Sequence, residues 1–156
     1  MKFNLNESQK KALDLNRDII VSAGAGSGKT TVLAERYISI FLNKSIHPPL
    51  SVENIVAITF TEKAAAQLRD KIGNRMEDYL SDTESGELRK RINKALENIG
   101  RAYISTIHGF CRRIISEFAL SRKLDPAFGV MDETETDALL EESLTEIFYT
   151  TGRDRS

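Results

Sequence analysis

The sequence has almost no cysteine, no long apolar run and no excess of one charge. Its single cysteine, Cys111, has no second cysteine for an intrachain disulfide, and one thiol cannot by itself build a metal site. No stretch approaches the roughly 18 consecutive apolar residues of a membrane-spanning helix, and the residues after Met1 lack the apolar core of a signal peptide. We therefore expect a soluble cytoplasmic protein with no membrane partner.

Charge is spread unevenly along the chain. The totals of 22 Lys and Arg against 23 Asp and Glu give no argument for nucleic-acid binding. Residues 1–131 hold 20 basic and 15 acidic residues, whereas residues 132–156 hold 2 and 8. An acidic segment therefore masks a mildly basic body.

The apolar pattern alternates between strands and helices over a length that suits one compact domain. Short β-branched runs predict strands at 18–22, 54–60 and 102–107. Apolar residues at helical spacing predict helices at 29–43, 65–80, 88–99 and 110–118. Capping-box spacing after Asn6 predicts a short helix at 7–16, and we expect a last, acidic helix at 134–149. This order predicts an open α/β fold, with a parallel sheet flanked by helices and joined by right-handed crossovers. Its ligand site is expected at the carboxyl ends of the strands.

A glycine-rich loop joins the first predicted strand to the first long helix. It reads Ala23-Gly24-Ala25-Gly26-Ser27-Gly28-Lys29-Thr30, a P-loop pattern with alanine in place of the usual first glycine. Glycines let successive backbone N–H groups face a phosphate, and the helix N-terminus adds partial positive charge. Lys29 can then reach the β- and γ-phosphates while the Thr30 hydroxyl binds Mg²⁺. We expect ATP and magnesium as cofactors, a site that extends to Thr31, and Lys29 and Thr30 as the catalytic residues.

Three segments together resemble the motifs of the UvrD, Rep and RecB-like superfamily 1 DNA helicases. The P-loop run resembles motif I, residues 58–65 (Ile-Thr-Phe-Thr-Glu-Lys-Ala-Ala) resemble motif Ia, and residues 105–111 (Ser-Thr-Ile-His-Gly-Phe-Cys) resemble the next DNA-contacting motif. The last segment, residues 124–128 and a helical insertion at about 61–100 look closer to the AddA and RecB helicase-nuclease subunits than to UvrD or Rep. The resemblance implies a RecA-like motor domain of which residues 1–156 are the incomplete N-terminal part.

Single-stranded DNA is the partner that the resemblance implies. The matching positions are Thr59, Phe60, Thr61, Lys63, Thr106 and His108. Phe60 could stack a base, the motif Ia threonines could donate to phosphates, and Lys63 adds charge. From the residues alone, we favour Phe60 as a core residue and Thr61 as a helix cap, while His108 can equally be structural. Gly109 stands where the family often has serine.

Two roles compete for Gln9. Its spacing from Asn6 is that of a capping box, which would use its side chain at the start of a helix. Gln9 also occupies the approximate place of the glutamine that reads adenine in similar helicases, and its amide offers both a donor and an acceptor. We favour the adenine role on the resemblance.

Asp132 and Glu133 look like the acidic motif II of these helicases, and we interpret them as a decoy. Gly129 interrupts the apolar approach to the pair, and Asp132 can be the N-cap of an acidic helix at about 132–150. The chain then lacks motif II and the later motifs, including the arginines of a second motor domain. Phosphoryl transfer depends on such charges, so we expect ATP binding without turnover.

The prediction is therefore the ATP-binding N-terminal fragment of an ATP-dependent DNA helicase that moves on single-stranded DNA. Its partners would be the rest of the helicase chain and, as a further candidate, a second helicase-nuclease subunit. Two alternatives stay open. A stand-alone nucleotide-gated DNA-binding module would differ only in whether the gene continues past Ser156. A small P-loop nucleotide kinase would need a lid with arginines, whereas the positions after the two later strands carry the helicase-like runs.

Overall fold

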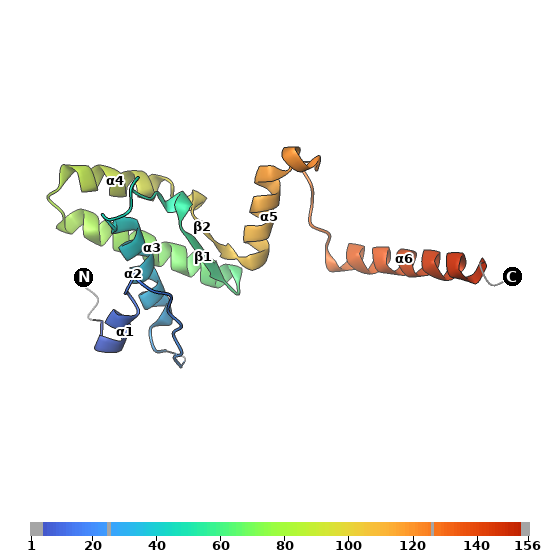
Figure 1. Ribbon diagram of the computed structural model, residues 1–156, viewed down its shortest axis with the longest axis horizontal. Coiled ribbons are helices and arrows are strands. Elements are labelled where there is room, and N and C mark those ends of the chain that lie inside the picture. Colours follow the sequence, from blue (N-terminus) through green and yellow to red (C-terminus); the bar gives the residue numbers. More distant parts are fainter. Residues whose placement is uncertain (1–4, 25, 126, 154–156) are drawn as a thin grey trace. The chain divides into compact units, whose positions relative to one another are not determined.

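The computed structural model describes residues 5–24, 26–125 and 127–153 (Figure 1). Its elements are α1 (Glu7–Lys11), α2 (Lys29–Leu42), η1 (Val52–Asn54), β1 (Val56–Thr59), α3 (Glu62–Asp82), α4 (Gly86–Glu97), η2 (Ile99–Arg101), β2 (Tyr103–Thr106), α5 (Ile107–Phe118), η3 (Leu120–Arg122) and α6 (Glu133–Arg153). The chain divides into two compact units, Met1–Arg113 and Ile114–Ser156. Across the described ranges, no helix is both long and apolar enough to cross a membrane.

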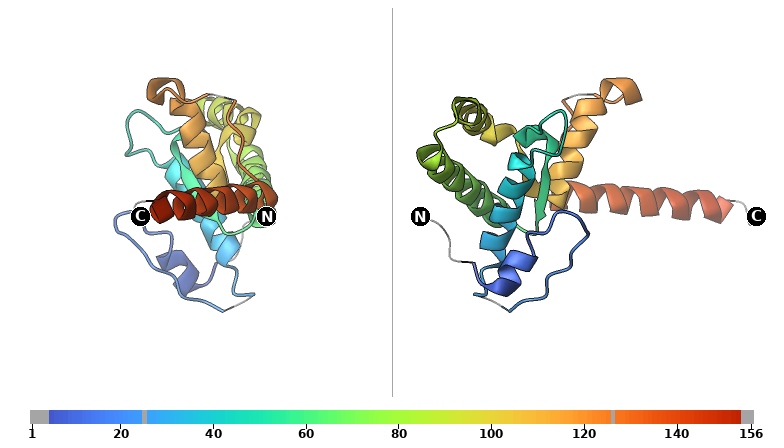
Figure 2. Two further views of the ribbon diagram at one scale, coloured as in Figure 1. Left: turned by 90° about the vertical axis from the view of Figure 1, so that its right-hand side faces the viewer. Right: turned by 60° about the vertical axis from the view of Figure 1, so that its left-hand side comes forward.

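A parallel pair of strands organises the first unit. β1 and β2 are hydrogen-bonded neighbours, with Val56 opposite Tyr103 at one end and Thr59 opposite Thr106 at the other. The connection between them is the pair of helices α3 and α4, which lie beside each other in both views of Figure 2. The predicted later strands and their parallel order are thus confirmed. Both strands end at the same edge of the sheet.

The predicted strand at 18–22 is wrong. These residues lie outside any sheet in the structure, and the side chain of Ile20 is fully exposed. A β-branched run favours extended backbone, but a strand exists only through hydrogen bonds to a neighbouring strand. Among the described residues the sheet has two strands, β1 and β2. The predicted crossover between 18–22 and 54–60 is therefore absent from the structure as well.

The predicted helices form, and their ends follow local hydrogen bonds. Thr61 is the N-cap of α3, where its hydroxyl accepts from the Ala64 amide at 3.1 Å. α4 ends at Glu97 with Asn98 as its C-cap, earlier than the predicted end near Gly100. α1 is shorter than predicted, because the carbonyls that follow it accept from the Arg36 guanidinium instead of from helical amides.

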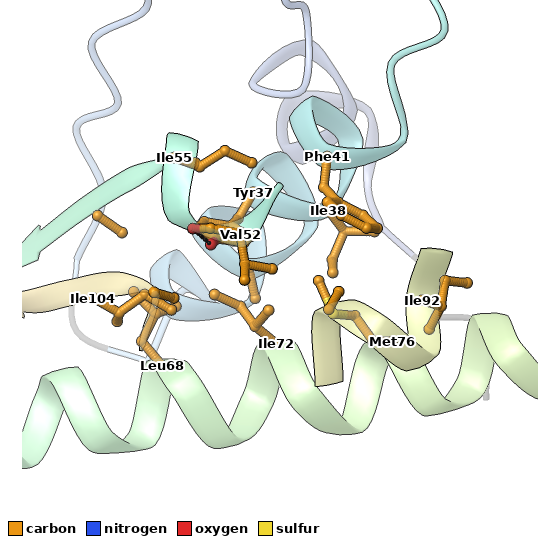
Figure 3. Packing of buried hydrophobic residues seen from close by; sticks show 14 residues of the cluster. Tyr37, Ile38, Phe41, Val52, Ile55, Leu68, Ile72, Met76, Ile92 and Ile104 are labelled. Atoms are coloured by element: carbon orange, nitrogen blue, oxygen red, sulfur yellow. Dashed lines mark hydrogen bonds between the residues drawn. The ribbon is translucent and has the colours of Figure 1, made fainter. Parts of the chain in front are cut away.

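The hydrophobic core of the first unit lies where α2, α3 and α4 meet the sheet and the segment before β1 (Figure 3). Its fully buried side chains are Tyr37, Ile38, Phe41, Val52, Leu68, Ile72, Met76, Ile92 and Ile104. Tyr37 carries the one hydroxyl of this group, which donates to the Val52 carbonyl at 3.0 Å. Burial raises the pKa of Tyr37 to about 12, so the phenol stays neutral in the core.

A buried ion pair joins α2 to α3 beside this core. The Arg75 guanidinium donates to the Glu35 carboxylate, and both side chains are at least nine-tenths buried. Arg75 also reaches Asp78 at 3.1 Å, one turn further along α3. Burial alone would lower the pKa of Arg75, but the hydrogen bonds from Arg75 to Glu35 and Asp78, together with the charge of Glu35, outweigh burial, and that pKa is raised.

The second unit contains the acidic helix that the sequence predicts. Asp132 accepts from the Glu135 amide at 2.9 Å, and the Asp132 amide donates to the Glu135 carboxylate at 3.0 Å. This reciprocal pair is a capping box, so the interpretation of Asp132 as the N-cap of α6 is confirmed.

Removing the cation of the buried ion pair should destabilise the first unit strongly. Arg75→Ala should lower the free energy of unfolding by about 3 to 5 kcal/mol, because the Glu35 carboxylate stays buried without its main partner. Urea unfolding followed by circular dichroism measures this change. Glu77→Ala, an exposed carboxylate on the same helix, should stay within about 0.5 kcal/mol of wild type. An Arg75→Ala chain that unfolds at the wild-type urea concentration would contradict the assignment.

Candidate functional site

The glycine-rich loop precedes α2 as the sequence predicts, and two of its glycines need their lack of a side chain. Gly26 and Gly28 have φ angles of 76° and 84°, in the left-handed region that favours glycine. Gly28 is the N-cap of α2, and a β-carbon there would lie 3.1 Å from the Gln9 amide nitrogen. Ala25, also predicted to bind nucleotide, lies outside the described residues.

Lys29 begins α2 and lies across the loop. Its ammonium donates to the carbonyls of Ala23 and Gly24, each at 2.7 Å, and the Ser27 hydroxyl donates to Gly24 at 2.8 Å. The first amides of a helix have no partner within the helix and carry its partial positive charge. The loop thus gathers an ammonium group and a helix N-terminus at one exposed place, which is the chemistry that binds phosphate.

The two threonines after Lys29 differ in their surroundings. Thr31 is half-buried and its hydroxyl accepts from the Lys71 ammonium at 2.7 Å, whereas Thr30 is exposed. Magnesium usually keeps several waters and takes its other ligands from one or two protein groups and substrate phosphates. A single exposed hydroxyl at Thr30 fits that need. Over the described ranges, no cluster of three or more His, Cys, Asp or Glu side chains could hold a metal.

Gln9 connects α1 to the loop. Its side-chain oxygen accepts from the Asn6 amide at 2.9 Å and the Asn6 side chain accepts from the Gln9 amide at 2.8 Å, so the capping box is formed. The side-chain nitrogen of Gln9 donates to the Ser27 carbonyl at 3.2 Å. A small hollow of about 170 Å³ lies beside this contact, lined by Gln9, Ser27 and Lys29 among others. Gln9 therefore lies next to the loop, and its amide is already bonded within the protein.

The end of β1 presents an exposed aromatic ring. Phe60 is fully exposed, so the interpretation of Phe60 as a core residue is wrong. Lys63 is exposed in the first turn of α3. The Thr59 hydroxyl donates to the Thr61 carbonyl at 3.0 Å, while Thr61 accepts from the helix as its N-cap and keeps a hydroxyl hydrogen to donate.

The end of β2 carries the second predicted segment. His108 is exposed, whereas Thr106 is buried. The Thr106 hydroxyl donates to the Glu62 carboxylate at 2.7 Å and accepts from the Gly109 amide at 3.1 Å. Both functions of the Thr106 hydroxyl are therefore used inside the protein. A β-carbon on Gly109 would lie 3.3 Å from Ser105 and from the Thr106 hydroxyl, so a serine would be crowded.

Sequence reasoning missed two polar residues beside these sites, Glu62 and Lys71. Glu62 reaches Thr106 across 44 positions of sequence, and Lys71 reaches Thr31 across 40. Neither residue shows a local pattern that marks its partner, because each contact is made by the packing of α3 against β2 or α2.

A glycine-rich loop before a helix and polar strand ends of this kind are found in a known protein family. The chain belongs to the UvrD/REP helicase N-terminal domain family, which matches residues 5–154, and the predicted family is thereby confirmed. An ATP-dependent helicase/nuclease subunit of Clostridium acetobutylicum is 39% identical over 148 residues, which cover 94% of this chain and 11% of that protein. The protein of the same name from Bacillus cereus (strain AH187) is 39% identical over 142 residues, covering 90% and 11%. The protein from Bacillus cytotoxicus is 37% identical over 142 residues, covering 91% and 11%. The chain thus spans about a tenth of the length of the curated relatives it matches.

Nucleotide binding should depend on the ammonium at the start of α2. Lys29→Ala should weaken ATP binding well over tenfold, because a charge-assisted bond to phosphate contributes about 1.5 to 3 kcal/mol. Isothermal titration calorimetry with Mg-ATP measures the change. Lys44→Ala, which removes an exposed lysine just past the other end of α2, should bind ATP as wild type does. Equal ATP affinity of the Lys29→Ala and wild-type chains would contradict the assignment of this loop as a phosphate-binding loop.

Proposed function

We propose that this chain is the ATP-binding N-terminal part of a motor domain in an ATP-dependent DNA helicase of the helicase-nuclease type. The observation that carries the proposal is the loop before α2, where the Lys29 ammonium and two left-handed glycines lie at a helix N-terminus. The relatives, which are named as subunits of an ATP-dependent helicase/nuclease, support the same interpretation. In the full protein, ATP hydrolysis would drive movement along single-stranded DNA.

ATP would bind with its phosphates over the glycine-rich loop. Lys29 would exchange the carbonyls of Ala23 and Gly24 for the β- and γ-phosphates, and the first amides of α2 would face the same oxygens. Magnesium would arrive with the nucleotide and take Thr30 as its protein ligand. The adenine would lie near Gln9, beside the hollow that this side chain lines.

Single-stranded DNA would bind at the sheet edge where β1 and β2 both end. Phe60 supplies a fully exposed ring on which a base can stack, and stacking tolerates any sequence because every base has a π-face. Lys63 and the free hydroxyl hydrogen of Thr61 would meet phosphate oxygens. His108 follows β2 at the same edge and completes this surface.

The partners follow from the proposed class. Because the relatives are roughly nine times longer than this chain, most of a motor of this kind would lie outside residues 1–156. Each relative is named as one subunit of its enzyme, so we also propose a second helicase-nuclease subunit as partner. Asp132 caps α6, and we assign the Asp132-Glu133 pair no part in catalysis. The chain would then bind ATP without turning it over.

Phe60 gives the sharpest test of DNA binding. Because its ring is fully exposed, Phe60→Ala should change the melting temperature little, while lost stacking should reduce affinity for oligo-dT by about 1 to 3 kcal/mol. Scanning calorimetry and fluorescence anisotropy at low salt measure the two effects. A drop in stability of about 3 to 5 kcal/mol would instead mark a core phenylalanine and contradict the stacking role.

Lys63→Ala is the matched comparison for Phe60→Ala. It removes a charge three positions away, so it should reduce the salt dependence of oligo-dT binding by about one counterion while stacking is retained. An equal effect of the two variants on the salt dependence would show that the Phe60 result reports general disruption of the edge.

ATP turnover tests the assignment of Asp132 and Glu133. Glu133→Gln should leave any residual ATPase rate unchanged, because the structure uses this segment to begin α6. Asp132→Asn should behave alike, since asparagine also caps helices well. A coupled assay in the presence and absence of oligo-dT measures the rate. A DNA-stimulated rate abolished by Glu133→Gln would show that the pair is a functional motif II.

A further inference from the structure

A carboxylate stands in the middle of the proposed DNA-binding edge, where phosphates would repel it. Glu62 is the first residue of α3, between the exposed Phe60 and Lys63. Each negative charge beside a nucleic-acid backbone weakens binding, so its presence there calls for a compensating role. A carboxylate in the first turn also stabilises a helix, and this is the simplest alternative explanation.

The contacts of Glu62 point to a different role. Its carboxylate accepts a hydrogen bond of 2.7 Å from the Thr106 hydroxyl, at the last position of β2. The same hydroxyl accepts from the Gly109 amide at 3.1 Å, which closes the turn from β2 into α5. A chain of two hydrogen bonds therefore runs from the start of α3, through the buried Thr106, to the turn that carries His108.

Gly109 shows how closely these groups pack. A β-carbon at Gly109 would lie 3.6 Å from the Glu62 carboxylate as well as 3.3 Å from the Thr106 hydroxyl. The turn after β2 thus lies directly against the Glu62–Thr106 bond. Moving the carboxylate away would leave the buried Thr106 hydroxyl without an acceptor for its hydrogen, which costs free energy unless the turn rearranges.

We propose that Glu62 is a positioning residue that holds the turn after β2 against the start of α3, so that the two segments form one single-stranded DNA surface. The inference rests on the proposed DNA binding at this edge. Glu62 itself touches no DNA in this account. Its carboxylate fixes Thr106 and Gly109, and they in turn set where His108 stands relative to Phe60.

Two single substitutions separate the effect of the length of the Glu62 side chain from the effect of its charge. Glu62→Gln keeps the length and an acceptor oxygen but removes the charge, whereas Glu62→Asp keeps the charge and the favourable helix start but is one CH₂ shorter. The positioning role predicts that Glu62→Gln binds oligo-dT at least as tightly as wild type. Glu62→Asp should bind about tenfold more weakly, the scale expected for loss of a charge-assisted hydrogen bond.

Thr106 provides the other half of the test. Thr106→Val removes the hydroxyl at constant shape and should weaken oligo-dT binding as Glu62→Asp does. Thr106→Ser keeps a hydroxyl and should bind oligo-dT as wild type does. The double variant Glu62→Asp/Thr106→Val should be no weaker than either single variant, because both remove the same bond. Glu77→Ala controls for the loss of a carboxylate elsewhere on α3 and should bind normally.

Amide hydrogen exchange at Gly109, followed by NMR, provides a readout without DNA. Exchange at Gly109 should be faster in Glu62→Asp and Thr106→Val than in wild type, and unchanged in Glu62→Gln. The reverse order of DNA affinities, or equal affinities for all variants, would overturn the inference. If wild type itself fails to bind oligo-dT, the proposed DNA binding fails. The exchange data then decide separately whether Glu62 positions the turn, and equal exchange in all variants would show that it does not.

Discussion

The parallel pairing of β1 with β2 determines how the first unit is arranged. Because Thr59 lies opposite Thr106, both strands end at one edge, where β2 continues directly into α5 and β1 reaches α3 after two residues. Phe60 and His108 therefore follow strand ends at the same edge, although they are far apart in sequence. The Glu62–Thr106 bond can form only at a shared edge of this kind. Antiparallel pairing would place the two strand ends at opposite edges.

The packing of α2 on α3 joins the helix that follows the glycine-rich loop to the helix that follows β1. The Lys71–Thr31 hydrogen bond lies near the start of α2, and the buried Glu35–Arg75 pair lies one turn further along both helices. The first half of α2, which follows the glycine-rich loop, is therefore held to α3, which begins at Glu62.

The sequence predicted those features that arise locally. The apolar spacing of residues 65–80 and the glycines before Lys29 found α3 and the loop, because helix faces and left-handed turns depend on nearby residues. The run at 18–22 was predicted as a strand and is not one, because hydrogen-bonded neighbours cannot be read from a single segment. The exposure of Phe60 was equally out of reach, since a phenylalanine at a strand end suits a core or a surface.

Gln9 and Glu62 show the same limit at the site itself. Sequence spacing supported a capping box and an adenine contact for Gln9, and only the structure shows the amide joining α1 to the loop. For Glu62, in α3, no local pattern marks a role, because its partner Thr106 lies on β2. Contacts between distant segments depend on how helices and strands pack, and periodicity within one segment carries no information about that packing.

We propose two separate ligand surfaces on this chain, one at the start of α2 and one at the ends of β1 and β2. Amide chemical shifts of the ¹⁵N-labelled chain, titrated first with Mg-ATP and then with oligo-dT at low salt, locate both surfaces in one experiment. We expect ATP to shift the amides of residues 26–31 and oligo-dT to shift those of residues 60–64 and 107–109. Shifts from either ligand that cluster instead around the hollow lined by Phe41, Arg91 and Arg101 would contradict it.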